Sequence, residues 1–295
     1  MKKSVFTGAG VAIVTPMKNN IVDFDALEKL IEFQIENFTD AIVVCGTTGE
    51  APTLEDDEHL DVIEFCVNKV NKRIPVIAGT GSNNTAHAVM MNKEAEKRGA
   101  DGLLWVAPYY NKATQNGLVE HYTTLAKSTS LPAILYNVPS RTGVNILPET
   151  IEKLAEIENI VAVKEASGKV EQAVEIINRC GDKIDVYSGN DDITVPIMSV
   201  GGKGVISVLS NILPKETHLM CKYALNGDFK SAGSLQVKYY NLINLLFKEV
   251  NPIPVKAALN LMGMIEKDIR LPLIPMSEHN LNLLKAEMKK LDIIK

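Results

Sequence analysis

Short runs of apolar and β-branched residues recur along the chain, and longer segments separate them. The runs cover Val11–Thr15, Ala41–Cys45, Pro75–Gly79, Gly102–Ala107, Ala133–Asn137, Ile160–Lys164, Asp185–Ser188 and Gly204–Val208. Continuous apolar runs of this length are typical of strands that are buried on both faces, as in a parallel sheet. We therefore predict eight buried parallel strands.

The segments between the runs carry apolar residues at helical spacing. Asp23 can cap the first helix, whose apolar face is expected to comprise Phe24, Leu27, Leu30, Ile31 and Phe38. Thr53 precedes Asp56 by three residues, which resembles a capping box at the start of the second helix. Pro148 suits a first helical turn, where its missing N–H costs nothing. Further helices are expected over Thr85–Arg98, Leu118–Ser128, Pro148–Glu156, Val170–Arg179, Ile193–Val200 and Lys215–Ala224.

Eight strand–helix repeats match a (β/α)₈ TIM barrel. A doubly wound open sheet is the competing architecture, but it usually has fewer strands and often a glycine-rich first turn. The strand pattern ends near Asn226, and helices are expected over Phe229–Val250, Val255–Met262 and Glu278–Leu291. We predict an α/β fold in which residues 1–226 form the barrel with the active site and residues 227–295 form a C-terminal helical domain.

Composition and charge narrow the classes of function. The net charge is −5 without a basic stripe, so nucleic-acid binding is not expected. Since no apolar stretch approaches the roughly 18 residues of a membrane span, no membrane partner is expected either. The apolar run Gly8–Val14 lacks the cleavage pattern of a signal peptide and is better explained as a first strand. The cysteines are far apart in sequence, which favours reduced thiols in a cytoplasmic protein.

Metal and phosphate chemistry have little support in the sequence. The histidines are scattered and form no motif of ligands, so we expect no metal site; they are His59, His87, His121, His218 and His279. Neither a P-loop nor a dinucleotide-binding fingerprint is present. The glycines before the eighth strand admit weak phosphate binding, but a glycine-rich entry into the strand explains them adequately.

Polar and aromatic residues gather where the predicted strands end. In a barrel of this type the carboxyl ends of the strands carry the chemistry. The segments at these ends are Gly46-Thr47-Thr48-Gly49-Glu50, Pro108-Tyr109-Tyr110-Asn111, Tyr136-Asn137-Val138-Pro139, Lys164 and Ser188-Gly189-Asn190-Asp191, and the eighth strand contains Ile206.

Lys164 is the pivotal candidate among these residues. It ends an apolar strand, where desolvation favours the neutral amine that attacks a ketone carbon. Glu165 should point to the opposite face by strand alternation. Taken alone, Lys164 is better explained as a lysine that reaches out at a strand end, and only its neighbours favour the reactive amine. Tyr136, at the same level on the next strand, is either structural or a proton donor.

Thr47, Thr48 and Gly189 also have two interpretations. The threonines can be simple turn residues, or their hydroxyls can hold a small carboxylate and pass a proton to Tyr136. Gly189 either makes a turn or permits a ligand to approach the backbone closely.

At these positions the chain resembles the dihydrodipicolinate synthase family, which lies within the N-acetylneuraminate lyase superfamily of class I aldolases. The resemblance covers the whole barrel in order, and the helical tail has the family's length. The stretches that carry it are Gly46-Thr47-Thr48-Gly49-Glu50, Pro108-Tyr109-Tyr110-Asn111-Lys112, Tyr136-Asn137-Val138-Pro139-Ser140-Arg141-Thr142-Gly143, Val163-Lys164-Glu165-Ala166-Ser167 and Gly189-Asn190-Asp191-Asp192.

The resemblance implies a lyase in the diaminopimelate route to lysine. Lys164 would form a Schiff base with pyruvate, and the resulting enamine would attack the aldehyde of L-aspartate 4-semialdehyde. Thr47, Tyr136 and Tyr110 would form a proton relay, with Tyr110 reaching in from a neighbouring subunit of a homotetramer, a dimer of dimers. Thr48 would bind the pyruvate carboxylate. Backbone groups of Gly189 and Ile206 would line the site, and no cofactor beyond the covalent Schiff base is implied.

Arg141 separates this interpretation from related ones. Its planar fork of donors suits the carboxylate of the second substrate, and sialic acid lyases lack an arginine at this place. N-acetylneuraminate lyase and keto-deoxy-sugar-acid aldolases are the alternatives within the superfamily. A catalytically silent binding barrel and an aldolase for phosphorylated sugars also stay open.

Feedback by free lysine is expected to be weak or absent. Family members that lysine inhibits bind it at a subunit interface with, among others, a histidine and a glutamate. The matching positions here are Asp56 and His87, whereas Asn83 and Tyr109 are retained. Loss of that glutamate removes a carboxylate that would pair with the ammonium of the effector.

Overall fold

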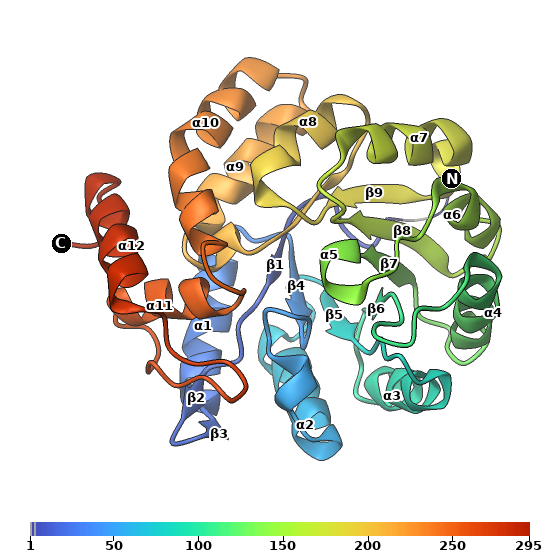
Figure 1. Ribbon diagram of the computed structural model, residues 1–295, viewed down its shortest axis with the longest axis horizontal. Helices are drawn as coiled ribbons and strands as arrows, with labels where there is room; N and C mark the ends of the chain where they lie inside the picture. The colour runs from blue at the N-terminus through green and yellow to red at the C-terminus, as the bar shows by residue number, and fades with distance from the viewer. Residues whose placement is uncertain (1, 3) are drawn as a thin grey trace.

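The computed structural model describes residue 2 and residues 4–295. A closed barrel of eight parallel strands forms its centre. Each strand pairs with the next, and the last pairs with the first, so the open-sheet alternative is excluded (Figure 1). The barrel strands are β1 (Gly8–Ala12), β4 (Ala41–Val44), β5 (Val76–Gly79), β6 (Gly102–Val106), β7 (Ala133–Asn137), β8 (Ile160–Glu165), β9 (Asp185–Ser188) and β10 (Gly204–Ser207).

Helices surround the barrel and follow its strands in order, as predicted (Figure 1). Asp23 caps the first helix through its carboxylate, which accepts a hydrogen bond from Ala26 N, and Pro148 lies in the first turn of its helix. The helices are α1 (Phe24–Glu36), α2 (Asp56–Val70), α3 (Thr85–Lys97), α4 (Gln115–Ala126), α5 (Pro139–Thr142), α6 (Pro148–Leu154), α7 (Val170–Cys180), α8 (Thr194–Ser199) and α9 (Pro214–Leu225).

The first strand differs from its prediction. β1 covers Gly8–Ala12, whereas the sequence pattern predicts Val11–Thr15. Ile13 and Val14 are as buried as the strand itself, so their apolar character marks a buried segment that lies beyond the ladder. The other strands begin and end within one residue of their predicted limits.

Three local predictions are wrong or incomplete. Glu55, not Thr53, stands at the N-cap of α2, and no side chain caps this helix. Phe38 does not share the buried face of α1, because it lies past the helix end with an exposed side chain and a φ of 67°. The sequence pattern also missed α5, the 3₁₀ turns and a small antiparallel hairpin; these are β2 (Met17–Lys18), β3 (Ile21–Val22), η1 (Ala51–Thr53), η2 (Gly181–Lys183), η3 (Asp191–Ile193) and η4 (Leu209–Asn211).

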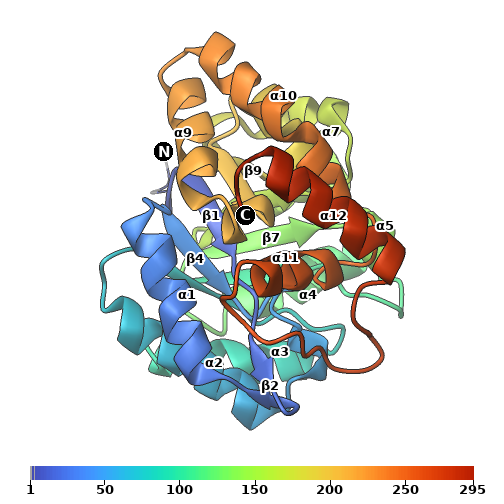
Figure 2. The ribbon, with the colours of Figure 1, turned by 90° about the vertical axis from the view of Figure 1, so that its left-hand side faces the viewer.

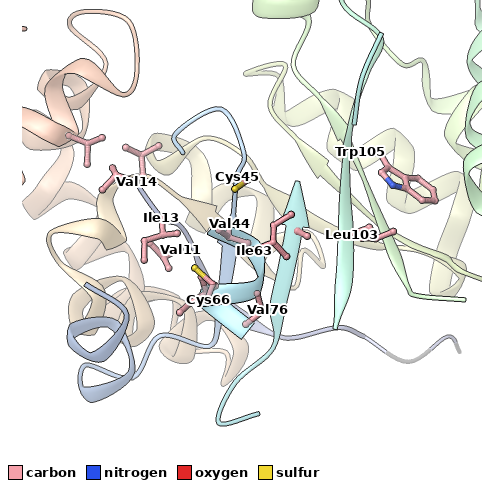
Figure 3. Close-up of a cluster of buried hydrophobic side chains, with 14 of the residues drawn as sticks. Val11, Ile13, Val14, Val44, Cys45, Ile63, Cys66, Val76, Leu103 and Trp105 are labelled. Carbon is pink, nitrogen blue, oxygen red and sulfur yellow. The ribbon is translucent and has the colours of Figure 1, made fainter. Parts of the chain in front are cut away.

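Two apolar layers hold the barrel together. The larger one lies between the strands and the helices, where Ile63 and Cys66 of α2 lie beside Val44 of β4 and Val76 of β5 (Figure 3). The second layer fills the interior of the barrel and contains, among others, Phe6, Ile77, Leu104, Tyr136, Ala162, Tyr187 and Ile206. A packed interior leaves the rim at the strand ends as the place for a site.

The C-terminal segment is helical, as predicted. It comprises α10 (Phe229–Leu246), α11 (Ile253–Leu261) and α12 (Glu278–Lys290). α10 packs against α8 and α9, while α11 and α12 pack against each other beside it (Figure 2). The division into two domains at residue 226 stays a prediction, because these helices share the apolar layer of the barrel.

Candidate active site

Strand alternation directs Lys164 into the barrel. In β8, Ala162 belongs to the interior layer and Val163 to the outer layer, so Lys164 faces inward like Ala162. The register agrees, since Lys164 pairs with Tyr136 on one side and Tyr187 on the other. Its side chain is 6% exposed, and Nζ lies 4.2 Å from the centroid of the Tyr136 ring. A buried amine thus lies over an aromatic ring.

Glu165 points away from Lys164, as strand alternation predicts. Its carboxylate accepts hydrogen bonds from Asn137 Nδ2 and Gln172 Nε2, both at 2.9 Å, on the outer side of the barrel. A further bond comes from Ser167 N at 2.7 Å. The carboxylate is therefore occupied in fixing the turn after β8 and does not pair with the amine.

Gly189 closes the space on the other side of Lys164. A Cβ atom at Gly189 would lie 3.2 Å from Lys164 Cε and 2.5 Å from Ala166 Cβ. The Gly189 N–H donates to Glu165 O at 2.7 Å, which holds the loop against β8. Ile206, buried in β10, belongs to the same interior layer as Tyr136. Lys164, Tyr136, Gly189 and Ile206 therefore meet in one region.

Thr47 and Thr48 lie in the loop between β4 and α2. The Thr15 hydroxyl donates to Gly49 O at 2.7 Å and so ties this loop to the end of β1. Thr48 is buried, and its Oγ1 accepts a hydrogen bond from Asn251 Nδ2 at 3.0 Å. The two neighbouring threonines thus have different surroundings: Thr48 contacts Asn251, whereas Thr47 lines a cavity.

That cavity is about 450 Å³ in volume and brings predicted residues together. Thr47, Tyr136 and Arg141 all line it. Thr47 comes from the connection after β4, whereas Tyr136 and Arg141 come from β7 and from α5, which follows β7 directly. A larger cavity of about 1090 Å³ is lined by residues that precede strands, such as Pro75, Pro132 and Asn159. The smaller cavity is the candidate site, because barrel chemistry lies at the carboxyl ends of the strands.

Arg141 reaches the site from α5, directly after β7. Its guanidinium Nη2 donates to the main-chain oxygen of Asn251 at 3.3 Å. A salt bridge to a neighbouring loop would give Arg141 a purely structural role. Within residues 2 and 4–295, however, Arg141 forms no ion pair. The guanidinium of Arg141 therefore lies on the cavity wall without a charged partner among these residues.

Tyr110 is not brought to the other predicted residues within the single chain. Its side chain is 89% exposed, and its φ of 71° places it in the left-handed region. Tyr109, its neighbour, lines the cavity instead. The expected role of Tyr110 in a neighbouring subunit therefore stays a prediction.

The chain is similar to known proteins over nearly its whole length. A model of the dihydrodipicolinate synthetase family matches residues 5–291. The chain belongs to this family. A 4-hydroxy-tetrahydrodipicolinate synthase of Acetivibrio thermocellus is 55% identical over 294 residues, which cover 100% of both chains.

Solved structures of dihydrodipicolinate synthetase family members superpose closely. The crystal structure of dihydrodipicolinate synthase from Aquifex aeolicus is 50% identical, covers 98% of this chain and 99% of its own, and has a TM-score of 0.96. The chloride-inhibited enzyme of Acinetobacter baumannii, complexed with pyruvate, is 48% identical, with the same coverage and TM-score. The family consists of lyases of the class I aldolase type.

Two residues of the C-terminal segment contact the loop that contains Thr47 and Thr48, and sequence reasoning missed both. Asn251 contacts Thr48, as described above, and Lys256 forms a buried ion pair with Glu50. Lys256 also donates to Thr15 O at 3.1 Å. The only signal for Asn251 is the proline that follows it, which predicts a turn but no partner.

Asp191 fixes the other side of the site. Its buried carboxylate accepts from Val208 N at 2.9 Å and from Leu209 N at 3.0 Å, so the loop after β9 is tied to the end of β10. Burial raises the pKa of Asp191 against the lowering effect of these hydrogen bonds. This family motif residue is therefore structural in its contacts.

The cysteines are buried, as the sequence indicates, whereas only His59 and His121 among the histidines are buried. The four cysteines are free and buried; burial raises the pKa of Cys66 to about 12. His59 is buried beside the cavity, where its Nε2 lies 2.8 Å from Gly79 O, and burial lowers its pKa. Within the described part of the chain, no three His, Cys, Asp or Glu side chains form a metal-binding group.

One finding bears on membranes. Across residues 2 and 4–295, no helix combines the length and the apolar character that crossing a bilayer requires.

Proposed function

We propose that the chain catalyses the reaction after which its relatives are named, the synthesis of 4-hydroxy-tetrahydrodipicolinate. The substrates would be pyruvate and L-aspartate 4-semialdehyde, as in the diaminopimelate route to lysine. The observation that carries this proposal is the enclosed amine of Lys164, 4.2 Å from the Tyr136 ring and against Gly189. The full-length identity to enzymes of this name supports it.

The reaction begins with an imine. The neutral amine of Lys164 attacks C2 of pyruvate, and the carbinolamine that forms loses water. Removal of a methyl proton turns the imine into an enamine, whose carbon attacks the aldehyde carbon of the semialdehyde. The aldehyde oxygen takes up a proton and becomes the 4-hydroxyl group. The amine of the semialdehyde then attacks the imine carbon, closes the ring and displaces Lys164.

Each remaining residue has a role in these steps. Tyr136 gives and takes the protons of carbinolamine formation and dehydration, and Thr47 connects it to Tyr110 of a neighbouring subunit. Thr48 donates to the pyruvate carboxylate, while backbone groups of Gly189 and Ile206 border the substrate. The enclosed position of Tyr136 over Lys164 supports the first of these roles.

Arg141 selects the second substrate. A guanidinium without an internal ion pair, on the wall of the cavity that Tyr136 also lines, suits a carboxylate on the incoming aldehyde. N-acetylneuraminate lyase and keto-deoxy-sugar-acid aldolases would handle polyhydroxylated aldehydes instead. The arginine favours the semialdehyde over these alternatives.

Members of the family act through a Schiff base with pyruvate and use no metal. We propose that this chain likewise forms a covalent Schiff base with pyruvate and uses no further cofactor. The proposal also includes a homotetramer, built as a dimer of dimers, and a location in the cytoplasm. Residues 227–295 would form a C-terminal helical domain.

Borohydride trapping tests the proposal. Labelled pyruvate and borohydride are expected to mark one peptide, the one that contains Lys164, and Lys164→Ala is expected to abolish the label. Lys256 is an internal control, because it is equally buried but ion-paired with Glu50. A label elsewhere, or faster turnover of N-acetylmannosamine than of the semialdehyde, would overturn the proposal.

A further inference from the structure

Asn251 joins the two residues to which carboxylate binding is assigned. It lies between α10 and α11 with 5% of its surface exposed. Its side-chain Nδ2 donates to Thr48 Oγ1 at 3.0 Å, and its main-chain oxygen accepts from Arg141 Nη2 at 3.3 Å. No other residue in the described part of the chain bonds to both.

The other end of this amide is unused. Within residues 2 and 4–295, Asn251 Oδ1 is buried and has no hydrogen-bond partner. A buried acceptor without a donor is costly, and native proteins contain few of them. Such an atom beside a ligand-binding arginine indicates a place where a ligand supplies an N–H or O–H group.

The proposed substrates differ in what they can supply. Pyruvate carries only acceptor oxygens and cannot satisfy Oδ1. L-aspartate 4-semialdehyde carries an amino group and a carboxylate on the same carbon, so the two protein groups that recognise them must be adjacent. Asn251 and Arg141 are neighbours of this kind, since the main-chain oxygen of Asn251 accepts from Arg141 Nη2 and the Oδ1 of the same residue has no partner.

We propose that Asn251 determines specificity for the amino group of the second substrate. Its Oδ1 accepts an N–H of that group while Arg141 binds the neighbouring carboxylate. The Nδ2 bond to Thr48 fixes the orientation of the amide and leaves the Thr48 hydroxyl hydrogen free to donate to pyruvate. This inference rests on the proposed function and names the group that separates the semialdehyde from its analogue without an amine.

The test compares two ligands on pyruvate-loaded enzyme. One is L-aspartate 4-semialdehyde, measured by its KM. The other is 4-oxobutanoate, which keeps the aldehyde and the carboxylate but lacks the amine, measured as a competing inhibitor. Asn251→Leu is expected to raise the KM about ten- to a hundredfold, the usual range for a hydrogen bond to a charged group. The inhibition constant of 4-oxobutanoate is expected to change less than about threefold.

Two variants complete the experiment. Asn251→Asp retains an acceptor and is expected to keep the KM for the semialdehyde low. Asn260→Leu is the matched control, because Asn260 lies in the same segment and its Nδ2 bonds only to Ile265 O at 2.8 Å. It is expected to change neither constant.

The outcomes separate this inference from the proposed function. If Asn251→Leu weakens both ligands equally, or weakens neither, Asn251 does not recognise the amine and the inference is overturned, while trapping of pyruvate on Lys164 still upholds the function. If the unaltered enzyme traps pyruvate but does not turn over the semialdehyde, both fall.

Discussion

At the scale of single residues, Lys164 is confined from two sides. The Tyr136 ring lies 4.2 Å from its Nζ, and the Gly189 backbone leaves room for its Cε only because that residue has no Cβ. Confinement lowers the number of rotamers that the long side chain samples, so the amine is held in one place before substrate arrives.

Gly189→Ala tests this confinement. The new Cβ would lie 3.2 Å from Lys164 Cε and closer still to Ala166, so the amine must shift. We expect kcat to fall by up to about a hundredfold, the loss that a 1 Å displacement of a reacting group can cause. Steady-state rates and borohydride trapping measure the effect.

Gly233→Ala is the control for this substitution. Gly233 lies within α10, and nothing surrounds its Cβ position within 4 Å. It is expected to keep full activity and gain a little stability from the better helix former. Equal rates for the two variants would contradict the confinement of Lys164.

His121 makes stability depend on pH. Burial lowers its pKa from 6.5 to about 4. The unfolded chain therefore takes up the proton first, and stability falls as the pH drops from 6.5 through about 4. His121→Gln is expected to remove up to about 3 kcal/mol of this loss, at 1.36 kcal/mol for each pKa unit. Urea denaturation between pH 7 and 4 measures the free energy of unfolding of both proteins. An equal loss of this free energy in both as the pH falls would refute the prediction.

At the scale of elements, the loop after β4 depends on a distant helix. Glu50 has a φ of 55° and is buried with Lys256 of α11, while its second oxygen accepts from Arg270 N at 3.2 Å. The C-terminal segment thus supports the loop that carries Thr47 and Thr48. A helix outside the barrel thus holds the loop to which we assign the binding of substrate.

Lys256→Met is expected to destabilise the protein by about 3–5 kcal/mol, because it leaves the Glu50 carboxylate buried without a partner. The double variant Glu50→Gln with Lys256→Met is expected to lose less, since no charge then remains buried. Chemical denaturation of both variants measures the difference. Lys290→Met is the control: Lys290 is 64% exposed in its pair with Glu287, and little change is expected. A double variant with a lower free energy of unfolding than Lys256→Met alone would contradict this account.

The sequence pattern predicted the elements well where apolar runs and hydrogen-bonded strands coincide. In β1 they do not coincide, because two glycines weaken the strand signal while Ile13 and Val14 extend the apolar run past the ladder. The site residues at strand ends were predictable for a geometric reason: parallel strands of a closed barrel end at one rim. Asn251 belongs to no strand, so no periodicity connects it to Thr48.

At the scale of the whole molecule, the exposed side chain of Tyr110 raises the question of which subunit it serves. Mixing two inactive variants answers it. When Lys164→Ala and Tyr110→Phe chains are refolded together, a relay in trans restores sites that have both Lys164 and Tyr110. We expect activity to return to a substantial fraction of the unaltered level. A mixture that stays as inactive as its components would place Tyr110 in its own subunit's site.

The pair formed by Asp56 and His87 bears on regulation. His87 Nε2 lies 2.9 Å from Asp56 Oδ1 on the wall of the cavity, so this carboxylate is already engaged. We expect free lysine to inhibit weakly or not at all at physiological concentrations. The double variant Asp56→His with His87→Glu restores the histidine and the glutamate of the inhibited relatives. It is expected to strengthen inhibition, which initial rates at increasing lysine concentrations would measure. Strong inhibition of the unaltered enzyme would refute this prediction.

The contact between Thr48 and Asn251 also has a consequence for biosynthesis. The two residues are 203 positions apart in the chain. At 5–20 residues per second, a ribosome needs roughly 10 to 40 s to reach Asn251 after it has added Thr48. During that time the nascent barrel lacks the amide that donates to the Thr48 hydroxyl. The site that we propose is therefore complete only after the chain has been extended past Asn251.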